Sequence, residues 1–381
     1  MLEEPSASLK AIDLAILTDV VCQDQRTTSL RITEWSVERL SDKGMANPDG
    51  SWLISGRGDV DGKSCPWSVV VKIIARPGRH IPQDARTYWK REFEVAKSGL
   101  AERLRGPVRA PRFYRADDHS ENVWIWMENV QDGHPGRWTF DDYIFAARQL
   151  GRWNGTTIKL ALPAEPWLAK NYHREWENVV NLEDDWKSPL HQKYITADIR
   201  NRFARLWKDR EQFYFCLENL PQCFTHFDCQ RRNLFIQTNT QNENIPLLVL
   251  DWGLCGVSAL GTELQALVGG STTFVEWPSS DLGALDAGAF TNYIEGLREA
   301  GWSGDPDLVR LGYVAMLAIY RGAILPHAMA NWFCTPNSRE RDLRQFGIAG
   351  EDLYLQFLGM LLYWLDCADE VRNLMIKMRF L

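Results

Sequence analysis

The chain lacks the cysteine patterns that mark metal-binding and redox proteins. Its eight cysteines are dispersed along 381 residues, no two of them form a C-x-x-C pair, and no histidines cluster at metal-ligand spacing. Zinc sites and thioredoxin-like redox motifs both need such spacing, so neither is expected. We interpret the cysteines as reduced thiols, the usual state in a cytoplasmic protein.

Targeting signals and an excess of basic charge are absent as well. No charged leader with an apolar core is visible, and no uninterrupted apolar run reaches the length of about 18 residues that suggests a membrane span. Lys and Arg number 43 against 50 Asp and Glu, a formal net charge of −7 at pH 7. Because nucleic-acid-binding domains carry a basic surface, we expect no nucleic-acid partner, no membrane contact and a cytoplasmic location. The oligomeric state stays open.

The composition is that of a folded protein with a sizeable core. Hydrophobic residues make up 45% of the chain and charged residues 24%, as in globular proteins. A chain of 381 residues is long for one hydrophobic core and suits two lobes.

Two acidic motifs carry the strongest chemical signal. They are His226-Phe-Asp-Cys-Gln-Arg-Arg-Asn233 and Asp251-Trp-Gly253. Transfer of a γ-phosphoryl group needs a carboxylate that orients the attacking hydroxyl and accepts its proton, together with oxygen ligands for Mg²⁺. Asp228 supplies the first function, while Asn233 and Asp251 supply an amide oxygen and a carboxylate for the metal. Such a pair suits Mg²⁺, which takes one or two carboxylates beside phosphate and water oxygens.

The chain between the motifs predicts a β-hairpin. Residues 234–237 and 246–250 are apolar and compatible with strands, and the polar, Asn-rich residues 238–244 separate them. Because a hairpin brings its two ends together, we expect Asn233 and Asp251 to lie side by side.

On these motifs the chain resembles the aminoglycoside phosphotransferase and choline kinase-like family, a branch of the protein-kinase-like fold. Members carry a His-x-Asp-x-x-x-x-Asn loop, followed by an Asp where protein kinases have Asp-Phe-Gly. The resemblance implies that Asp228 is the catalytic base and that Asn233 and Asp251 bind the metal. It implies that His226 orients the loop by hydrogen bonding, and we count Arg232 of the same loop as a further candidate catalytic residue.

The resemblance also implies the architecture and the cofactors. The fold class is α+β, a two-lobed protein-kinase-like fold with a mainly antiparallel β N-lobe and a helical C-lobe. We expect a nucleotide-binding lobe at residues 1–129 and a catalytic and substrate-binding lobe at residues 130–381. ATP·Mg²⁺ would bind in the cleft, with GTP as a possible alternative donor.

Lys72 is the clearest signal in the first lobe. It interrupts an apolar, strand-like run at residues 67–74, where a charge is costly unless it is paired. The resemblance gives it the α- and β-phosphates and a Glu of the next helix, predicted at residues 87–104, as partners. Glu92 and Glu94 are both available, and we choose Glu92 because Arg91-Glu92 matches the family pattern. The alternative is a lysine that extends from an edge strand into solvent.

Two further segments complete the predicted nucleotide site. A short helix at residues 9–21 and a strand at 32–40 precede a turn-rich loop at 42–50 and a strand at 51–55, which together predict a hairpin. The loop would cover the phosphates, although it matches neither G-x-G-x-x-G nor the Walker pattern. Residues 123–130 read as a strand leading into the hinge. The resemblance places adenine against backbone groups near Glu128 to Val130, with Met127 at the back of the pocket.

The phosphate acceptor is the least legible feature. Residues 163–221 are dense in acids and aromatics, which would suit a cationic or amino-sugar acceptor but also occur in ordinary helix packing. The members concerned are Trp167, Tyr172, Trp176, Glu177, Glu183, Asp184, Asp185, Trp186, Tyr194 and Trp207. Glu276, Asp281 and Asp286 read as loop residues at the rim of an acceptor site. A hydroxyl-bearing small molecule is the expected partner. A Ser or Thr of a peptide precursor and a non-catalytic, kinase-like binding protein are the alternatives.

Overall fold

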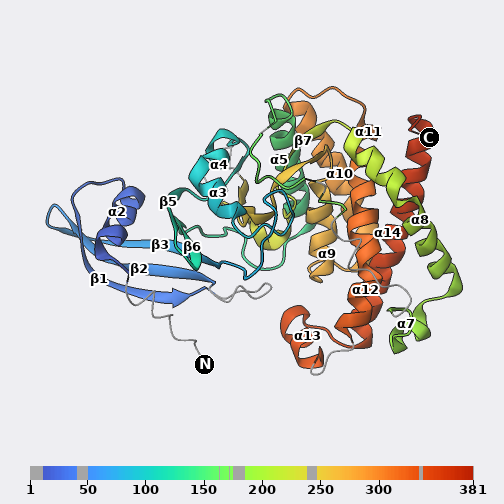
Figure 1. Ribbon diagram of the computed structural model, residues 1–381, viewed down its shortest axis with the longest axis horizontal. Coiled ribbons are helices and arrows are strands. Elements are labelled where there is room, and N and C mark those ends of the chain that lie inside the picture. The colour runs from blue at the N-terminus through green and yellow to red at the C-terminus, as the bar shows by residue number, and fades with distance from the viewer. Residues whose placement is uncertain are drawn as a thin grey trace. The chain divides into compact units, whose positions relative to one another are not determined.

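The computed structural model describes residues 12–40, 50–162, 164–170, 172–174, 185–237, 247–333 and 338–380 (Figure 1). The chain divides into two compact units. The first comprises Met1–Pro82, Thr87–Arg105 and Arg109–Asp132, and the second comprises Gln83–Arg86, Gly106–Val108 and Gly133–Leu381. The main division after Asp132 falls close to the predicted boundary after residue 129.

The first unit is built on a five-stranded antiparallel sheet. Its strands are ordered β1-β2-β3-β6-β5, with the following bounds: β1 Leu30–Arg39, β2 Ser51–Val60, β3 Lys63–Ala75, β5 Phe113–Asp118 and β6 Asn122–Glu128. Helix α2, Leu14–Gln25, precedes them and overlaps the helix predicted at residues 9–21, of which residues 9–11 lie outside the described residues. The predicted hairpin of β1 and β2 is present, and its loop at residues 42–49 lies outside the described residues.

Alternation along the central strands creates two apolar layers in this unit. Leu17, Val20 and Val21 of α2 belong to a cluster with Val69, Val71 and Trp126 on one side of the sheet. Val70, Ile125 and Met127 point to the other side, where they form a cluster with Phe93. The period of two places neighbouring residues on opposite faces, so both faces of β3 and β6 are buried.

Two short helices follow β3 in the place of the single predicted one. They are α3, Arg91–Ser98, and α4, Leu100–Arg103, and the prediction of one continuous helix at 87–104 is therefore wrong. Gly99 separates them with a φ of 67°, a left-handed conformation that glycine adopts without steric cost and that ends a helix.

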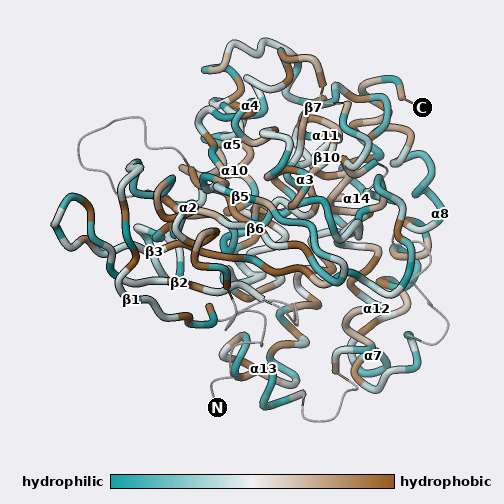
Figure 2. Tube along the Cα trace, turned by 60° about the vertical axis from the view of Figure 1, so that its left-hand side comes forward, coloured by the Kyte–Doolittle hydropathy of each residue, from teal (hydrophilic) through white to brown (hydrophobic). Residues whose placement is uncertain are grey.

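The second unit is mostly helical. Its longer helices are α5 Phe140–Thr157, α7 Pro189–Tyr194, α8 Ala197–Asn219, α10 Leu282–Glu299, α13 Ser338–Phe346 and α14 Glu351–Lys377, with the three-residue α9 at Ser271–Thr273. Helices α5 and α10 pack closely: a Cβ on Gly151 would lie 2.1 Å from the Tyr293 carbonyl oxygen. Helices α8 and α13 are mainly hydrophilic along the trace in Figure 2, and α8 buries one apolar face through Phe203, Leu206 and Phe213.

Short strands and helical turns carry the loops of this unit. Strand β7, Gln222–Thr225, pairs with β10, Gly256–Ala259, and β8, Leu234–Ile236, pairs with β9, Leu247–Val249. The two-residue β4, Val108–Arg109, pairs with β9 and completes a three-stranded sheet in the order β4-β9-β8. Single turns of 3₁₀-helix occur as η1 Arg231–Asn233, η2 Trp252–Leu254 and η4 Ser279–Asp281, and π-helical turns as η3 Gln265–Gly270 and η5 Leu317–Gly322.

One helical run has the length and composition of a membrane span. It covers Pro306–Trp332 and joins α11 Pro306–Met316, the π-helical η5 and α12 Ala323–Trp332. In its most apolar 18-residue window, 72% is buried inside the protein. Its partners include α14 and α8, so the run has the burial of a core helix. The sequence did not indicate a membrane span here, because Arg310 and Arg321 interrupt the apolar residues of this run.

Candidate active site

The first acidic motif forms a tight loop directly after β7. Phe227 has a φ of 66°, a left-handed conformation that is costly for an aromatic residue and that is found most often at functional sites. Its ring is held by a stacked contact with Tyr172, at 4.2 Å between centroids and an interplanar angle of 4°. The strained backbone places the next residue, Asp228, at a fixed point after the strand.

The Asp228 carboxylate is held by two amide side chains. Asn233 donates from Nδ2 to the Oδ2 of Asp228 at 2.7 Å and to its backbone oxygen at 3.0 Å. Gln230 donates from Nε2 to Oδ1 at 3.1 Å. Because the amide nitrogen of Asn233 faces Asp228, its amide oxygen is the atom that can serve a metal.

The predicted hairpin brings the second motif to the first. Leu234 pairs with Val249, and the Leu250 N–H donates to the Asn233 carbonyl oxygen at 2.9 Å. The ladder therefore continues to Asn233 at one end and to the residue before Asp251 at the other, as predicted. Asp251 is exposed and has a φ of 61°, a second left-handed non-glycine residue. The loop at residues 238–246 lies outside the described part of the chain.

Electrostatics show that the two carboxylates are neighbours. Burial, followed by the charge of Asp251, raises the pKa of Asp228 to about 7, against the opposing effects of Arg321 and the two amide hydrogen bonds. Two carboxylates that repel each other, with an amide oxygen beside them, form an oxygen donor set that a divalent cation would stabilise. The residues present thus fit Mg²⁺.

His226 is buried behind the loop. Its Nδ1 accepts a hydrogen bond from the backbone N–H of Asp228 at 3.3 Å, and the backbone N–H of His226 donates to Oε2 of Glu263 at 2.9 Å. The Trp252 ring packs edge-on against the imidazole at 5.1 Å. This geometry supports the predicted orienting role of His226, which stays a prediction.

Glu263 is a residue that the sequence analysis missed. It is 1% exposed, and burial raises its pKa to about 7. A carboxylate oxygen of Glu263, a ring nitrogen of His226 and the Sγ atom of Cys229 lie within 4.8 Å of one another, which is the spacing of a metal site. The Cys229 thiol, however, is hydrogen bonded to Glu263, and burial raises the pKa of Cys229 well above its usual value. Glu263 thus accepts hydrogen bonds from the Cys229 thiol and from the backbone N–H of His226, and the three residues support the loop.

The two arginines of the loop have different surroundings. Arg232, a candidate catalytic residue, pairs from Nε with Oε1 of Glu276 at 3.1 Å, and its guanidinium lies 3.9 Å from the centre of the Phe274 ring. Arg231 is buried and donates to the backbone oxygens of His134 and Gly136 at 2.8 and 2.9 Å. Arg231 thus ties the segment before α5 to the loop, while a catalytic role of Arg232 stays a prediction.

In the first unit, Lys72 and Glu92 form the predicted pair. The Nζ of Lys72 lies 2.5 Å from Oε2 of Glu92, and their side chains are 18% and 4% exposed. The pair joins β3 to α3. Lys72 is on the central part of the sheet, opposite Ile125 of β6 and Ser51 of β2, so the alternative of a lysine on an edge strand is wrong.

The predicted hinge residues end strand β6. Met127 is 7% exposed and packs in the apolar cluster with Phe93. The Glu128 carboxylate accepts from Arg109 at 2.9 Å and from the Arg112 backbone N–H at 3.0 Å. Although burial acts to raise the pKa of Glu128, these hydrogen bonds hold it below its usual value. Contacts of adenine with Met127, Glu128 or Val130 stay predictions.

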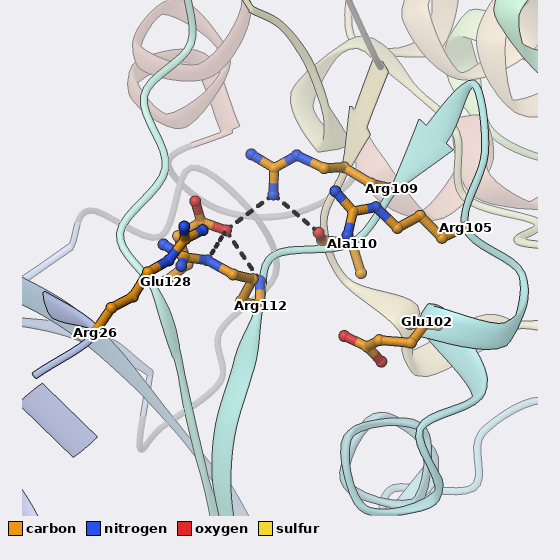
Figure 3. A pocket seen from close by; sticks show the side chains of 8 residues that line it. Arg26, Glu102, Arg105, Arg109, Ala110, Arg112 and Glu128 are labelled. Carbon is orange, nitrogen blue, oxygen red and sulfur yellow. Dashed lines mark hydrogen bonds and ion pairs between the residues drawn. The ribbon is translucent and has the colours of Figure 1, made fainter. Parts of the chain in front are cut away.

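Glu128 also borders a surface pocket of the first unit. The pocket has a volume of about 270 Å³, and the side chains of Arg26, Glu102, Arg105, Arg109 and Arg112 lie around it (Figure 3). In this view the Glu128 carboxylate is joined by dashed lines to Arg109 and Arg112. The Glu128 side chain is therefore engaged by arginines, and its backbone N–H donates to the Arg112 carbonyl oxygen at 2.9 Å.

Three of the four described acids considered for the acceptor site are paired with basic side chains of the protein. Asp286 lies in α10, is 1% exposed and pairs with Arg310 at 2.6 Å, so its assignment to a loop at the rim is wrong. Asp185 pairs with His327 at 3.0 Å, and Glu276 with Arg232. The side chains of Trp167 and Tyr172 are buried. Trp176, Glu177, Glu183 and Asp184 lie outside the described residues.

The sheet-based first unit, the helical second unit and this loop define a phosphotransferase of the protein-kinase-like fold. Residues 66–302 match the profile of the phosphotransferase enzyme family, APH, and the chain belongs to that family. The prediction of a phosphotransferase with an alcohol group as acceptor, a small-molecule kinase, is confirmed by this membership. No curated protein sequence matches the chain.

Solved structures confirm the fold class. A microcompartment-associated aminopropanol kinase matches with a TM-score of 0.53 and 14% identity, covering 95% of this chain and 98% of its own. An amicoumacin kinase in complex with AMP-PNP, Ca²⁺ and its ligand has a TM-score of 0.51 and 13% identity, with 96% of each chain covered. A spectinomycin phosphotransferase in complex with ADP and spectinomycin has a TM-score of 0.50 and 11% identity, covering 90% of this chain and 94% of its own.

Proposed function

We propose that this protein transfers the γ-phosphoryl group of ATP to a hydroxyl group of a small molecule inside the cell. The observation that carries the proposal is the Asp228 carboxylate, held by Asn233 and Gln230 beside Asp251. The similar structures include complexes with AMP-PNP and ADP, which supports an adenine nucleotide as donor.

The reaction requires one proton acceptor and one leaving group. The oxygen of the acceptor hydroxyl attacks the γ-phosphorus, the bond from this phosphorus to the bridging oxygen of the β-phosphate breaks, and ADP leaves with the bond's electron pair. Asp228 accepts the hydroxyl proton. A carboxylate with a pKa of about 7 is half ionised near neutral pH, so it can hold the hydroxyl and take its proton.

Asn233 and Asp251 would hold Mg²⁺, which neutralises charge on the phosphates when it is bound. His226 and Glu263 fix the backbone of the loop through its N–H groups. Lys72, with its charge directed by Glu92, would orient the α- and β-phosphates. Catalysis by these groups consists of alignment and charge stabilisation.

The acceptor differs among the similar structures, which are named for aminopropanol, amicoumacin and spectinomycin. An amino-bearing alcohol is therefore one class to test. Asp185, Glu276 and Asp286 do not favour it, because they are already paired with basic side chains.

Calorimetric titration with a non-hydrolysable ATP analogue and with the GTP analogue, each with and without Mg²⁺, tests the nucleotide site. We expect saturable binding of the ATP analogue that is tighter with Mg²⁺. Phosphorylation of a hydroxyl compound, followed by ADP release and by mass spectrometry of the product, tests the activity. A protein that binds neither nucleotide and forms no product with any alcohol would be a non-catalytic relative.

A further inference from the structure

Arg321 is a half-buried cation of the second unit without a carboxylate partner among the described residues. Other partly buried arginines of this unit have one: Arg232 pairs with Glu276, Arg310 with Asp286, and Arg372 with Asp209. The charge of Arg321 acts on Asp228, but no ion pair joins them. A guanidinium that is partly out of water without a hydrogen-bonded anion can be satisfied by an anionic ligand.

The backbone around Arg321 is unusual as well. Arg321 lies in the π-helical turn η5, Leu317–Gly322, and the π-helical turn η3, Gln265–Gly270, packs beside it. A π-helical turn is a rare, costly insertion in a helix, and such turns occur frequently at functional sites. Here two of them meet at one arginine.

Hydrogen bonds through Gln265 connect Arg321 to the catalytic loop. Its Nε donates to Oε1 of Gln265 at 3.1 Å, and Gln265 donates from Nε2 to the Phe227 carbonyl oxygen at 2.9 Å. A Cβ on Gly270 would lie 3.3 Å from one terminal nitrogen of Arg321 and 3.0 Å from the Cβ of Gln230. Since Gln230 also donates to Asp228, the guanidinium lies one side chain away from the catalytic carboxylate.

The surroundings of this guanidinium are aromatic and cationic. Arg321 lies 4.9 Å from the centre of the Tyr320 ring, and the Tyr320 hydroxyl is 3.1 Å from that of Tyr172. The Arg86 guanidinium lies over the Tyr172 ring at 5.6 Å. Tyr172 in turn stacks on Phe227, so two positive charges and two phenol groups adjoin the residue that precedes Asp228.

We propose that Arg321 and Tyr320 recognise an anionic group of the acceptor, and that the acceptor is a hydroxy compound carrying a carboxylate. The inference rests on the proposed function, because it assigns the acceptor of the same reaction. Arg321 offers the planar pair of N–H donors that matches a carboxylate. Its charge also offsets the repulsion that an anionic acceptor meets from Asp228 and Asp251.

A second anion could occupy Arg321, namely the γ-phosphoryl group itself. The two roles have different consequences. An arginine that binds the transferred group affects every acceptor alike and also affects hydrolysis of ATP by water. An arginine that binds the acceptor's carboxylate affects only acceptors that carry one.

The test compares acceptors that share one secondary alcohol, namely lactate, 1-amino-2-propanol and 1,2-propanediol, together with larger matched triplets of the same three charge types. Each is assayed with Mg·ATP for kcat/KM, and acceptors that are not turned over are assayed for binding to the nucleotide-loaded protein by calorimetry. The variants are Arg321→Gln, the charge-retaining Arg321→Lys, and Arg298→Gln as a control that removes an exposed arginine of the same unit.

We expect the carboxylate members to be preferred, and Arg321→Gln to lower their kcat/KM or affinity on the order of 10- to 100-fold, the value of a charge-assisted hydrogen-bond pair. In Arg321→Gln, the kcat/KM for neutral and ammonium acceptors should stay within about twofold of the wild type, and so should the nucleotide affinity and the rate of ATP hydrolysis by water. Arg321→Lys should recover part of the loss, and Arg298→Gln should match the wild type.

Three results would overturn the proposal: preference for the ammonium members, an equal loss with all acceptors, or neither turnover nor binding of any carboxylate member. If ammonium or neutral alcohols are phosphorylated in preference to the carboxylate members, the acceptor assignment fails while the proposed phosphotransferase activity stands. If no nucleotide binds and no alcohol is phosphorylated, the proposed function itself fails.

Discussion

Replacing Asp228 by Asn should make the protein more stable and nearly inactive at the same time. The wild-type carboxylate is a destabilising group because the fold removes it partly from water and sets it beside Asp251. Active sites often carry such a cost, which substitution relieves with loss of function. As a general base, the carboxylate contributes a factor on the order of 10²–10⁴, so kcat should fall by that amount.

The magnitude follows from the shift and from the hydrogen bonds. The pKa of Asp228 rises from 3.8 to about 7. At about 1.36 kcal/mol per unit, this is about 4 kcal/mol against folding when the group is ionised. Asp228 is half-buried, so solvent screening reduces this figure, and we take about 2 kcal/mol. Asn has one acceptor oxygen for the two amides of Gln230 and Asn233, and loss of one hydrogen bond costs about 1 kcal/mol.

The net gain is about 1 kcal/mol, which corresponds to a rise in Tm of about 2–4 °C for a unit of this size. The gain depends on pH. Because the folded-state pKa is raised, the folded protein binds a proton that the unfolded chain has released, and wild-type stability falls as pH rises from 3.8 to about 7. The advantage of the variant is thus complete above about pH 7 and absent below about pH 4.

Calorimetric unfolding of wild type and Asp228→Asn at pH 8 and at the lowest pH that keeps both folded checks the prediction. Asp352→Asn, which removes an exposed carboxylate from the first turn of α14, is the control and should give no gain. An unchanged Tm of the Asp228 variant at pH 8, or a gain independent of pH, would refute the electrostatic argument. Retained turnover would refute the assignment of the base.

Lys72→Ala should weaken binding of a non-hydrolysable ATP analogue on the order of 10-fold or more, and it should destabilise the first unit because Glu92 is left buried and unpaired. Lys63→Ala, at the exposed start of the same strand, should change neither the affinity nor the stability. Titration calorimetry measures the affinity, and scanning calorimetry measures the stability. Asp251→Asn should reduce the Mg²⁺ dependence of nucleotide binding, and an unchanged affinity for Mg·ATP would contradict its metal role. Gly151→Ala should cost about 2–4 kcal/mol in denaturant unfolding, because its Cβ would lie 2.1 Å from a carbonyl oxygen of α10, while Gly283→Ala meets only an ordinary contact at 3.7 Å.

The parts of the site that the sequence predicted are those encoded by local spacing. The apolar runs on both sides of a polar loop predict a hairpin, and the hairpin alone brings Asn233 next to Leu250 and Asp251. Lys72 was recognised in the same way, because a charge in an apolar strand needs a partner and Glu92 is on the next helix. Alternation and loop length are properties of neighbouring residues, so they can be read before folding.

What only the tertiary structure decided is the set of residues that surrounds Asp228 from distant parts of the chain. Glu263, Gln265 and Tyr172 belong to no motif, and their contacts with residues 226–227 depend on how distant segments pack. Arg321 reaches this loop through its hydrogen bond with Gln265, where two π-helical turns meet. Asp286 was misread for the same reason, since its burial against Arg310 is invisible in its own neighbourhood. The sequence by itself determined the phosphoryl-transfer chemistry and the order of sheet and helices. Packing between distant helices determined which charges are paired, as Asp286 is with Arg310, and it placed Arg321 beside Gln265, near the loop that carries Asp228.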